Sequence, residues 1–177
     1  MRQRQIALLR GVNLGKHNRV PMAELRGEMA ALGFGEVATH LQSGNVVFSA
    51  TISADAAEQV IAEGIANRFG IEVPVLVRTR DEMAALITAD PLAGIATDPA
   101  KYLVTFLSAK PDPDRFAALE PPEPELVRFG ERELFVWCPD GVRNTRVSQS
   151  WLERRLGVTA TSRNWSTVER LLAIAEG

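Results

Sequence analysis

Residues 36–49 read EVATHLQSGNVVFS and contain two extended runs, at 36–41 and 46–49. Between them stand Gln42, Ser43, Gly44 and Asn45, a short polar segment with a glycine where a tight turn needs a positive φ. Apolar and β-branched residues on both sides favour strands over a helix. The stretch therefore predicts a β-hairpin, and its flanks predict how that hairpin joins a larger sheet.

One strand and one helix are predicted on each side of the hairpin. Before it, residues 4–10 form an apolar strand, which we expect in the interior of its sheet, and Pro21 stands at the first position of a helix. After it, Ser53 caps a second helix and residues 71–78 form a further strand. The order β-α-β-β-α-β within 79 residues is the ferredoxin-like order.

The same order returns in the second half of the chain. A linking helix begins at the capping box Thr79-Arg80-Asp81-Glu82. The later elements are a strand at 102–107, a helix from Asp112, a hairpin at 126–138, a helix from Ser148, a strand at 158–161 and a helix opened by a capping box at 166–169. We expect an α+β protein of two ferredoxin-like halves plus a C-terminal helix. Its subdomains are 1–79 and 101–177, joined by a helix and loop at 80–100.

The composition excludes several classes of protein. The chain has 177 residues, of which 46% are hydrophobic and 24% charged, which is typical of a globular protein and not of a disordered one. No apolar run approaches the length of a membrane span, and no secretory signal is visible. Together with the single Cys138, this predicts a cytoplasmic protein. The net charge of −2 indicates no global attraction to nucleic acid or anionic membranes.

The motif search finds no complete motif for catalysis or cofactor binding. Gly11 and Gly15 enclose three residues instead of four and His17 follows Lys16, so a Walker A loop is absent. The dinucleotide fingerprint, zinc-site spacings and the nucleophile elbow of serine hydrolases are also missing, and only two histidines exist. We therefore predict no metal and no cofactor, leave the catalytic residues unassigned, and leave open whether the chain is an enzyme.

Three polar clusters remain, at residues 10–18, 42–45 and 161–167. Taken singly, each can serve a turn or a helix cap. In a β-α-β-β-α-β unit, however, the first strand–helix loop and the hairpin turn lie at the same sheet edge, so the first two clusters should converge and offer donors to an anion. The candidate ligand-binding residues are Arg10, Asn13, Gly15, Lys16, Ser43, Gly44, Asn45, Arg163 and Asn164.

These clusters also carry a resemblance to a known family. The matching blocks are Leu8–Gly15, Val20–Leu25, Gln42–Phe48 and Ala160–Val168. In them the chain resembles the domain of unknown function 1697 family, which implies a bacterial cytoplasmic protein with a duplicated α+β fold and no assigned activity. Lys16 stands where the family often has a second glycine, which leaves the role of a loop lysine open. Thr145-Arg146 replaces a common Ser-Lys pair, which argues against a lysine-dependent reaction there.

The sequence leaves three functions open. The first is a module that binds a small anionic or phosphate-bearing ligand such as a nucleotide. The second is a nucleic-acid-binding protein, which is less favoured because the strand at 6–9 carries no aromatic residue and the net charge is negative. The third is an enzyme acting on a phosphorylated substrate, for which no general base can be named. Trp165 is read as a core residue rather than a ligand contact, and the oligomeric state stays open.

Overall fold

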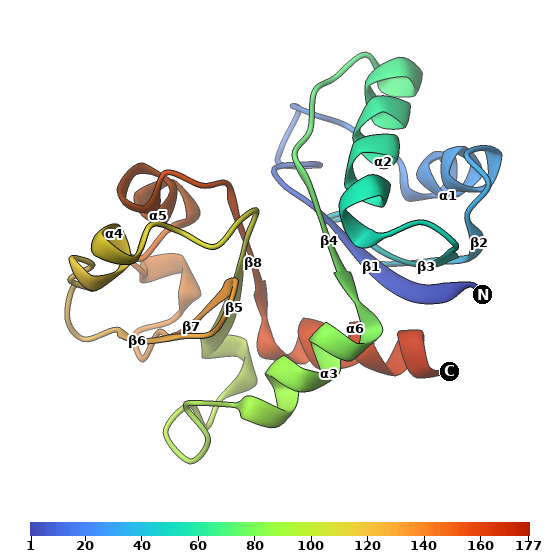
Figure 1. Cartoon of the computed structure of the whole chain (residues 1–177). Coiled ribbons are helices and arrows are strands. Elements are labelled where there is room, and N and C mark those ends of the chain that lie inside the picture. Colours follow the sequence, from blue (N-terminus) through green and yellow to red (C-terminus); the bar gives the residue numbers. More distant parts are fainter. The chain divides into compact units, whose positions relative to one another are not determined.

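The computed structural model describes residues 1–177, which form two four-stranded antiparallel sheets and six α-helices (Figure 1). The chain divides into two compact units, one made of Met1–Ala85 with Arg170–Gly177 and the other of Leu86–Glu169. The expected α+β class is therefore observed. The expected subdomain limits at 79 and 101 remain a prediction. The division into units differs from them in one respect, since Arg170–Gly177 of the C-terminal helix groups with the first unit.

The first unit is a sheet with two helices on one face. Its elements are β1 (Gln3–Leu9), α1 (Met22–Ala31), β2 (Gly35–His40), β3 (Asn45–Ala50), α2 (Ala54–Phe69), β4 (Val75–Thr79) and the start of α3 (Arg80–Ala89). The sheet order is β2-β3-β1-β4, so β1 is interior as expected. Ile6, Ala7, Leu8 and Leu9 are all fully buried.

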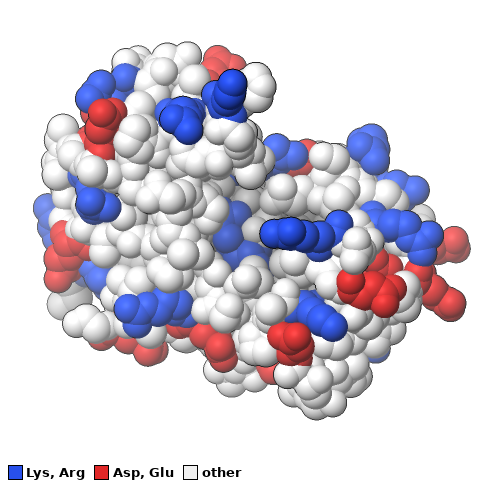
Figure 2. All heavy atoms as spheres, turned by 180° about the vertical axis from the view of Figure 1, so that it is seen from behind, with Lys and Arg blue, Asp and Glu red and all other residues white.

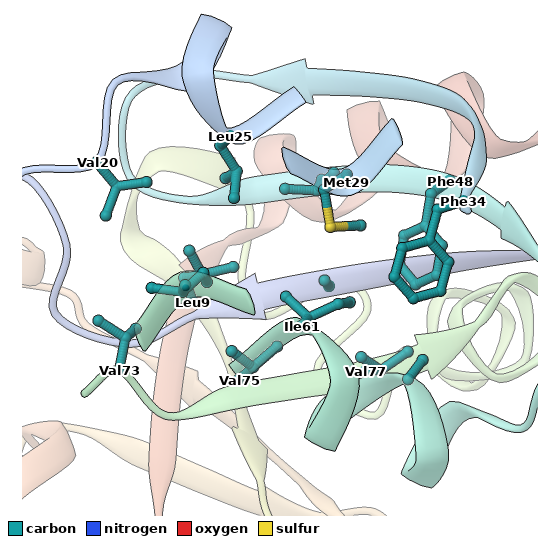
Figure 3. Close-up of a cluster of buried hydrophobic side chains, with 14 of the residues drawn as sticks. Leu9, Val20, Leu25, Met29, Phe34, Phe48, Ile61, Val73, Val75 and Val77 are labelled. Atoms are coloured by element: carbon teal, nitrogen blue, oxygen red, sulfur yellow. The ribbon is translucent and has the colours of Figure 1, made fainter. Parts of the chain in front are cut away.

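The core of the first unit lies between this sheet and the helices α1 and α2. Figure 3 shows Leu9 of β1 and Val75 of β4 facing Leu25 and Met29 of α1 and Ile61 of α2. Phe34 and Phe48 meet edge to face, with ring centroids 4.8 Å apart. Each fully buried side chain of this kind contributes about 1.5–3 kcal/mol to folding, so this packing fixes the loops at the ends of β1.

The second unit repeats the sheet order with its own elements. They are β5 (Tyr102–Leu107), α4 (Pro113–Ala117), β6 (Leu126–Phe129), β7 (Glu133–Trp137), α5 (Gln149–Leu156), β8 (Ala160–Asn164) and the start of α6 (Trp165–Glu176). The sheet order is β6-β7-β5-β8. One core cluster joins Leu107, Leu134 and Val136 of this sheet to Leu152 and Leu156 of α5.

Most helix caps follow the sequence prediction. The Ser53 and Ser148 hydroxyls accept hydrogen bonds from Ala56 N–H and Trp151 N–H at 3.2 and 3.1 Å. The capping box at the start of α3 is complete, since Glu82 N–H donates to the Thr79 hydroxyl at 3.1 Å and Thr79 N–H donates to Glu82 Oε2 at 2.8 Å. These contacts satisfy amides that a helix start otherwise leaves without a partner.

Four predicted boundaries are wrong. The strand expected at 71–78 is β4, which spans Val75–Thr79, so residues 71–74 lie outside it. Pro21 precedes α1 as its cap residue instead of occupying its first turn. The last strand was expected at 158–161, but β8 spans Ala160–Asn164 because it pairs along its whole length with β5. Helix α6 therefore begins at Trp165, and its cap is Asn164, whose Oδ1 accepts from Thr167 N–H at 2.9 Å, and not Ser166. No helix in the chain has both the length and the apolar character needed to cross a membrane; the cytoplasmic location stays a prediction.

Candidate functional site

The β1–α1 connection and the β2–β3 turn are in direct contact at one edge of the first sheet. Leu9 N–H donates to the Gly44 carbonyl at 2.8 Å, and the Asn13 Nδ2 group donates to the Gln42 carbonyl at 2.5 Å. The first two polar clusters therefore lie side by side, as expected from the order of the strands.

Asn13 uses its whole side-chain amide in holding this edge together. Its Oδ1 accepts from Val20 N–H at 2.9 Å, and its Nδ2 donates to the Val20 carbonyl at 2.9 Å in addition to the Gln42 carbonyl. Its backbone has φ +56°, a left-handed conformation that asparagine tolerates better than most residues. The amide therefore closes the β1–α1 connection into a loop and fastens that loop to the neighbouring turn.

The β2–β3 turn is held by similar local contacts. Asn45 is fully buried, and its Nδ2 donates to the His40 carbonyl at 2.8 Å and to the Ser43 hydroxyl at 3.0 Å. Gly44 has φ +86°, and a Cβ at this position would lie 2.7 Å from Leu9 Cβ and from Val12 Cγ2. These residues shape the turn from within, whereas Ser43 itself is exposed.

A hollow of about 370 Å³ lies between the loop and the turn. Its lining residues are Asn13, Gly15, Arg19, Pro21 and Gln42, and we call it the loop–turn hollow. Two of the predicted residues, Asn13 and Gly15, thus line a depression at the start of α1. The first amides of a helix have no acceptor inside the helix and carry the positive end of its dipole, so this position suits a negative group.

Two cations on this loop are exposed and carry no hydrogen bond or ion pair. They are Lys16, beside the lining residue Gly15, and Arg19, which lines the hollow. Arg10 is half-buried at the end of β1, where its N–H donates to the Pro74 carbonyl at 2.9 Å. The predicted residues on this edge therefore fall into three groups. Asn13, Gly44 and Asn45 hold the loops, Gly15, Lys16 and Ser43 are exposed, and Arg10 is half-buried.

His40 lies at the end of β2, next to the turn. Burial, and secondarily the positive Arg170, hold the pKa of this histidine below its usual 6.5. Its imidazole is therefore neutral at physiological pH. It does not line the loop–turn hollow.

The third predicted cluster belongs to the second unit. Arg163 is buried in β8, where its Nη1 donates to the Thr161 hydroxyl at 2.7 Å and to the Ser162 carbonyl at 2.9 Å. Burial lowers the pKa of this guanidinium to about 10, so it keeps its charge at neutral pH. The Asn164 side chain caps α6 and also accepts from the Ser166 hydroxyl at 2.9 Å. Both side chains therefore have partners within their own unit.

Three lining residues were not among the predicted set. Gln42 and Pro21 lie inside segments that the sequence singled out, but neither was assigned to the site. Arg19 stands directly before Val20-Pro21, the segment that leads into α1. Its place just before a predicted helix start is the sequence feature that could have assigned Arg19 to the lining.

Comparison with known proteins identifies a matching sequence family and a similar solved structure. The model of the family described as "Protein of unknown function (DUF1697)" matches residues 2–135, which confirms the resemblance seen in the sequence blocks. A solved structure, that of the conserved bacterial protein SP0830 from Streptococcus pneumoniae, is similar with a TM-score of 0.79 and 24% identity over 99% of both chains. At that identity the likeness concerns the fold. A search among curated proteins returns no match.

Proposed function

The chain belongs to the family described as protein of unknown function DUF1697, and since that description gives no function, we propose one from the geometry of the chain's own residues. The function is binding of a small anionic ligand, most simply a phosphate-bearing one, in the loop–turn hollow. The observation that carries this proposal is the pair of exposed cations without partners, Lys16 and Arg19, beside a hollow at the start of α1.

Each part of the hollow supplies a different contact to such a ligand. Arg19 offers a planar guanidinium that can form two parallel hydrogen bonds to a phosphate. Gly15 has φ +64° and open space where a side chain would be, so a ligand can approach its backbone closely. The Gln42 side chain adds an amide from the turn. The side-chain amide of Asn13 already forms hydrogen bonds with Val20 and Gln42, so its role is to hold the loop in the shape that the ligand needs.

Two other functions receive less support from the same residues. Stacking of nucleic-acid bases needs several exposed aromatic side chains. Tyr102 and Phe135 of the second sheet and Trp165 at the start of α6 are buried, which leaves Phe129 of β6 as the strongly exposed aromatic there. Figure 2 shows basic and acidic side chains interspersed on the face in view, without a continuous basic area. A reaction needs a general base or nucleophile, and the lining of the hollow contains no carboxylate, imidazole or thiol. We therefore propose binding and no reaction.

Titration with inorganic phosphate, pyrophosphate and adenosine monophosphate tests the proposal. We expect saturable shifts of the backbone amide signals of residues 13–24 in nuclear magnetic resonance spectra, and weaker binding at high salt. Arg19→Ala should weaken binding by about tenfold, since a charged hydrogen bond contributes about 1.5–3 kcal/mol. Arg154→Ala removes an equal charge from an exposed position of α5 and should leave binding unchanged. Equal weakening by both variants would reject the site.

We also propose that the two halves are ferredoxin-like duplicates. The support is the sheet order, because in each unit the first strand lies between the third and the fourth, as in β3-β1-β4 and β7-β5-β8, and the second strand is outermost. Expression of residues 1–79 alone tests whether the first half is a unit by itself, since an independent ferredoxin-like unit should fold cooperatively. A fragment that folds only when Arg170–Gly177 is supplied would contradict this, because that segment groups with the first unit.

A further inference from the structure

A second hollow, of about 280 Å³, lies in the second unit at the position that corresponds to the loop–turn hollow. It lies between the β5–α4 connection and the β6–β7 turn, just as the first lies between the β1–α1 connection and the β2–β3 turn. In both, a proline at the start of the helix is part of the lining, Pro21 in one and Pro113 in the other. The lining differs in chemistry, because the second hollow is mainly apolar.

Two phenylalanines form the wall of this second hollow. The rings of Phe116 and Phe129 have centroids 3.9 Å apart, and Phe129 exposes 42% of its surface. We call this site the Phe116 hollow. Its volume of about 280 Å³ lies at the lower end of the range of about 300–1,000 Å³ that is usual for ligand pockets. Its apolar wall suits a large apolar side chain, the kind of anchor that dominates protein interfaces.

Strand β6 beside the hollow has an open edge. It is the outermost strand of its sheet (Figure 1). Gly130 N–H donates to the Glu133 carbonyl of β7 at 2.8 Å, so the backbone groups of Gly130 face β7. Because alternate residues of an antiparallel strand face the partner, Val127 and Phe129 direct their backbone N–H and C=O groups away from β7. The Arg128 Nη1 group donates to the Val127 carbonyl at 3.0 Å, so one acceptor of this edge is covered only by an exposed side chain.

The segment that supplies the lining residues carries an acidic excess. Its two charged lining residues, Lys110 and Glu131, form an ion pair at 3.4 Å. Of the other exposed charges within residues 110–131, four are acidic and two are basic; they are Asp112, Asp114, Glu120, Glu123, Arg115 and Arg128. An acidic excess attracts a basic partner and repels a second copy of the same surface.

We propose that β6 and the Phe116 hollow form a docking surface for an extended basic peptide segment of another protein. The segment adds a strand to β6, and one of its apolar side chains occupies the hollow. Backbone hydrogen bonds to the edge provide affinity, while the hollow and the acidic side chains of residues 110–131 select the sequence.

A peptide of about seven residues that alternates lysine and valine around a central phenylalanine is a suitable probe, because its length matches that of a typical strand. A second peptide with glutamate in place of lysine is the charge control. We expect fluorescence anisotropy to show saturable, salt-dependent binding of the lysine peptide and much weaker binding of the glutamate peptide. Equal binding of both peptides, or no binding of either, would overturn the proposal.

A matched pair of variants on β6 locates the binding. Phe129→Ser removes one wall of the hollow and should weaken the lysine peptide by about tenfold or more. Leu126→Ser changes a side chain of similar exposure three positions earlier, on the opposite face of the strand, and should change affinity little. Equal effects of the two substitutions would contradict the assignment.

A third variant does not depend on the stability of Phe129→Ser. Ala117 is exposed and lines the hollow, so Ala117→Leu should fill the space and weaken the peptide while the protein stays folded. Sedimentation velocity tests the competing occupant. A dimer of the free protein that Phe129→Ser dissociates would identify the surface as a self-interface and overturn the proposal.

Discussion

The side-chain amide of Asn13 forms hydrogen bonds in both directions with the backbone of Val20. It accepts from the Val20 N–H and donates to the Val20 carbonyl, each at 2.9 Å. The six residues between Asn13 and Val20 are thereby closed into a loop between β1 and α1, and the remaining amide hydrogen reaches the Gln42 carbonyl. A residue that composition alone would assign to ligand binding thus determines the shape of the proposed site.

Asn13→Ala should therefore destabilise the protein. Three hydrogen bonds are lost, each contributing about 0.5–1.5 kcal/mol, so we expect a decrease of about 2–4 kcal/mol in the free energy of unfolding in urea. Asn18→Ala is the control, because Asn18 also has a positive φ but makes only one side-chain hydrogen bond, at 3.3 Å to the Gly11 carbonyl. If the two variants lose equal stability, backbone strain and not the Asn13 amide accounts for the loss.

The contrast between Asn13 and Thr79 illustrates which features the sequence could predict. The capping box from Thr79 to Glu82 was identified correctly because both partners lie within four residues of each other. The partners of Asn13 are seven and 29 residues away, and they are backbone groups that any residue type can supply. The loop and the turn could be located from the sequence, but the sequence could not show which of their polar groups form hydrogen bonds with each other.

The error at β8 has a related cause. A polar run from Thr161 to Asn164 resembles a loop, yet Ser162 pairs with β5 through its hydroxyl, 2.7 Å from that of Thr105, and its N–H donates to Gln149 Oε1 at 2.6 Å. These partners lie far along the chain, so local propensity could not anticipate the strand. The Phe116 hollow was missed for the same reason, since Phe116 and Phe129 meet only in the folded unit.

Gly44 and Gly15 should respond differently to alanine. Both have a positive φ, but a Cβ at Gly44 would lie 2.7 Å from two side-chain carbons, whereas a Cβ at Gly15 would meet nothing within 4 Å. We expect Gly15→Ala to cost about 1–2 kcal/mol from backbone strain alone, and Gly44→Ala to cost about 1–3 kcal/mol more from crowding. Chemical denaturation of the two variants gives the difference; equal costs would show that the turn relaxes around the added methyl group.

Trp165 should be one of the most sensitive positions in the second unit. Its ring is buried and stacks on Tyr102 with centroids 4.5 Å apart and planes 8° from parallel. Trp165→Ala should therefore cost about 3–5 kcal/mol. Trp151→Ala is the control, since Trp151 is only half-buried and stacks with the Arg155 guanidinium at 4.1 Å, and it should cost clearly less. An unchanged melting temperature for Trp165→Ala would return this residue to the list of candidate ligand contacts.

Tyr102 should make folding stability depend on alkaline pH. It is the single tyrosine of the chain, it is buried, and its hydroxyl donates to Asp90 Oδ1 at 2.8 Å. Burial, and then the hydrogen bond and negative charge of Asp90, raise the pKa of the phenol well above its usual 10. A raised pKa in the folded state means that folding favours the protonated phenol. Its contribution is therefore complete below pH about 10, the pKa in the unfolded chain, and decreases as the pH rises above that value.

Ultraviolet absorbance reports this titration directly, because only one tyrosinate can form. We expect no tyrosinate in the folded protein at a pH where the urea-unfolded chain is already half ionised. Tyr102→Phe should lose stability at neutral pH, because the Asp90 carboxylate loses its donor, and the difference from the parent protein should shrink as the pH rises above about 10. A phenol that titrates near 10 in the folded protein would show that the hydrogen bond to Asp90 does not persist in solution.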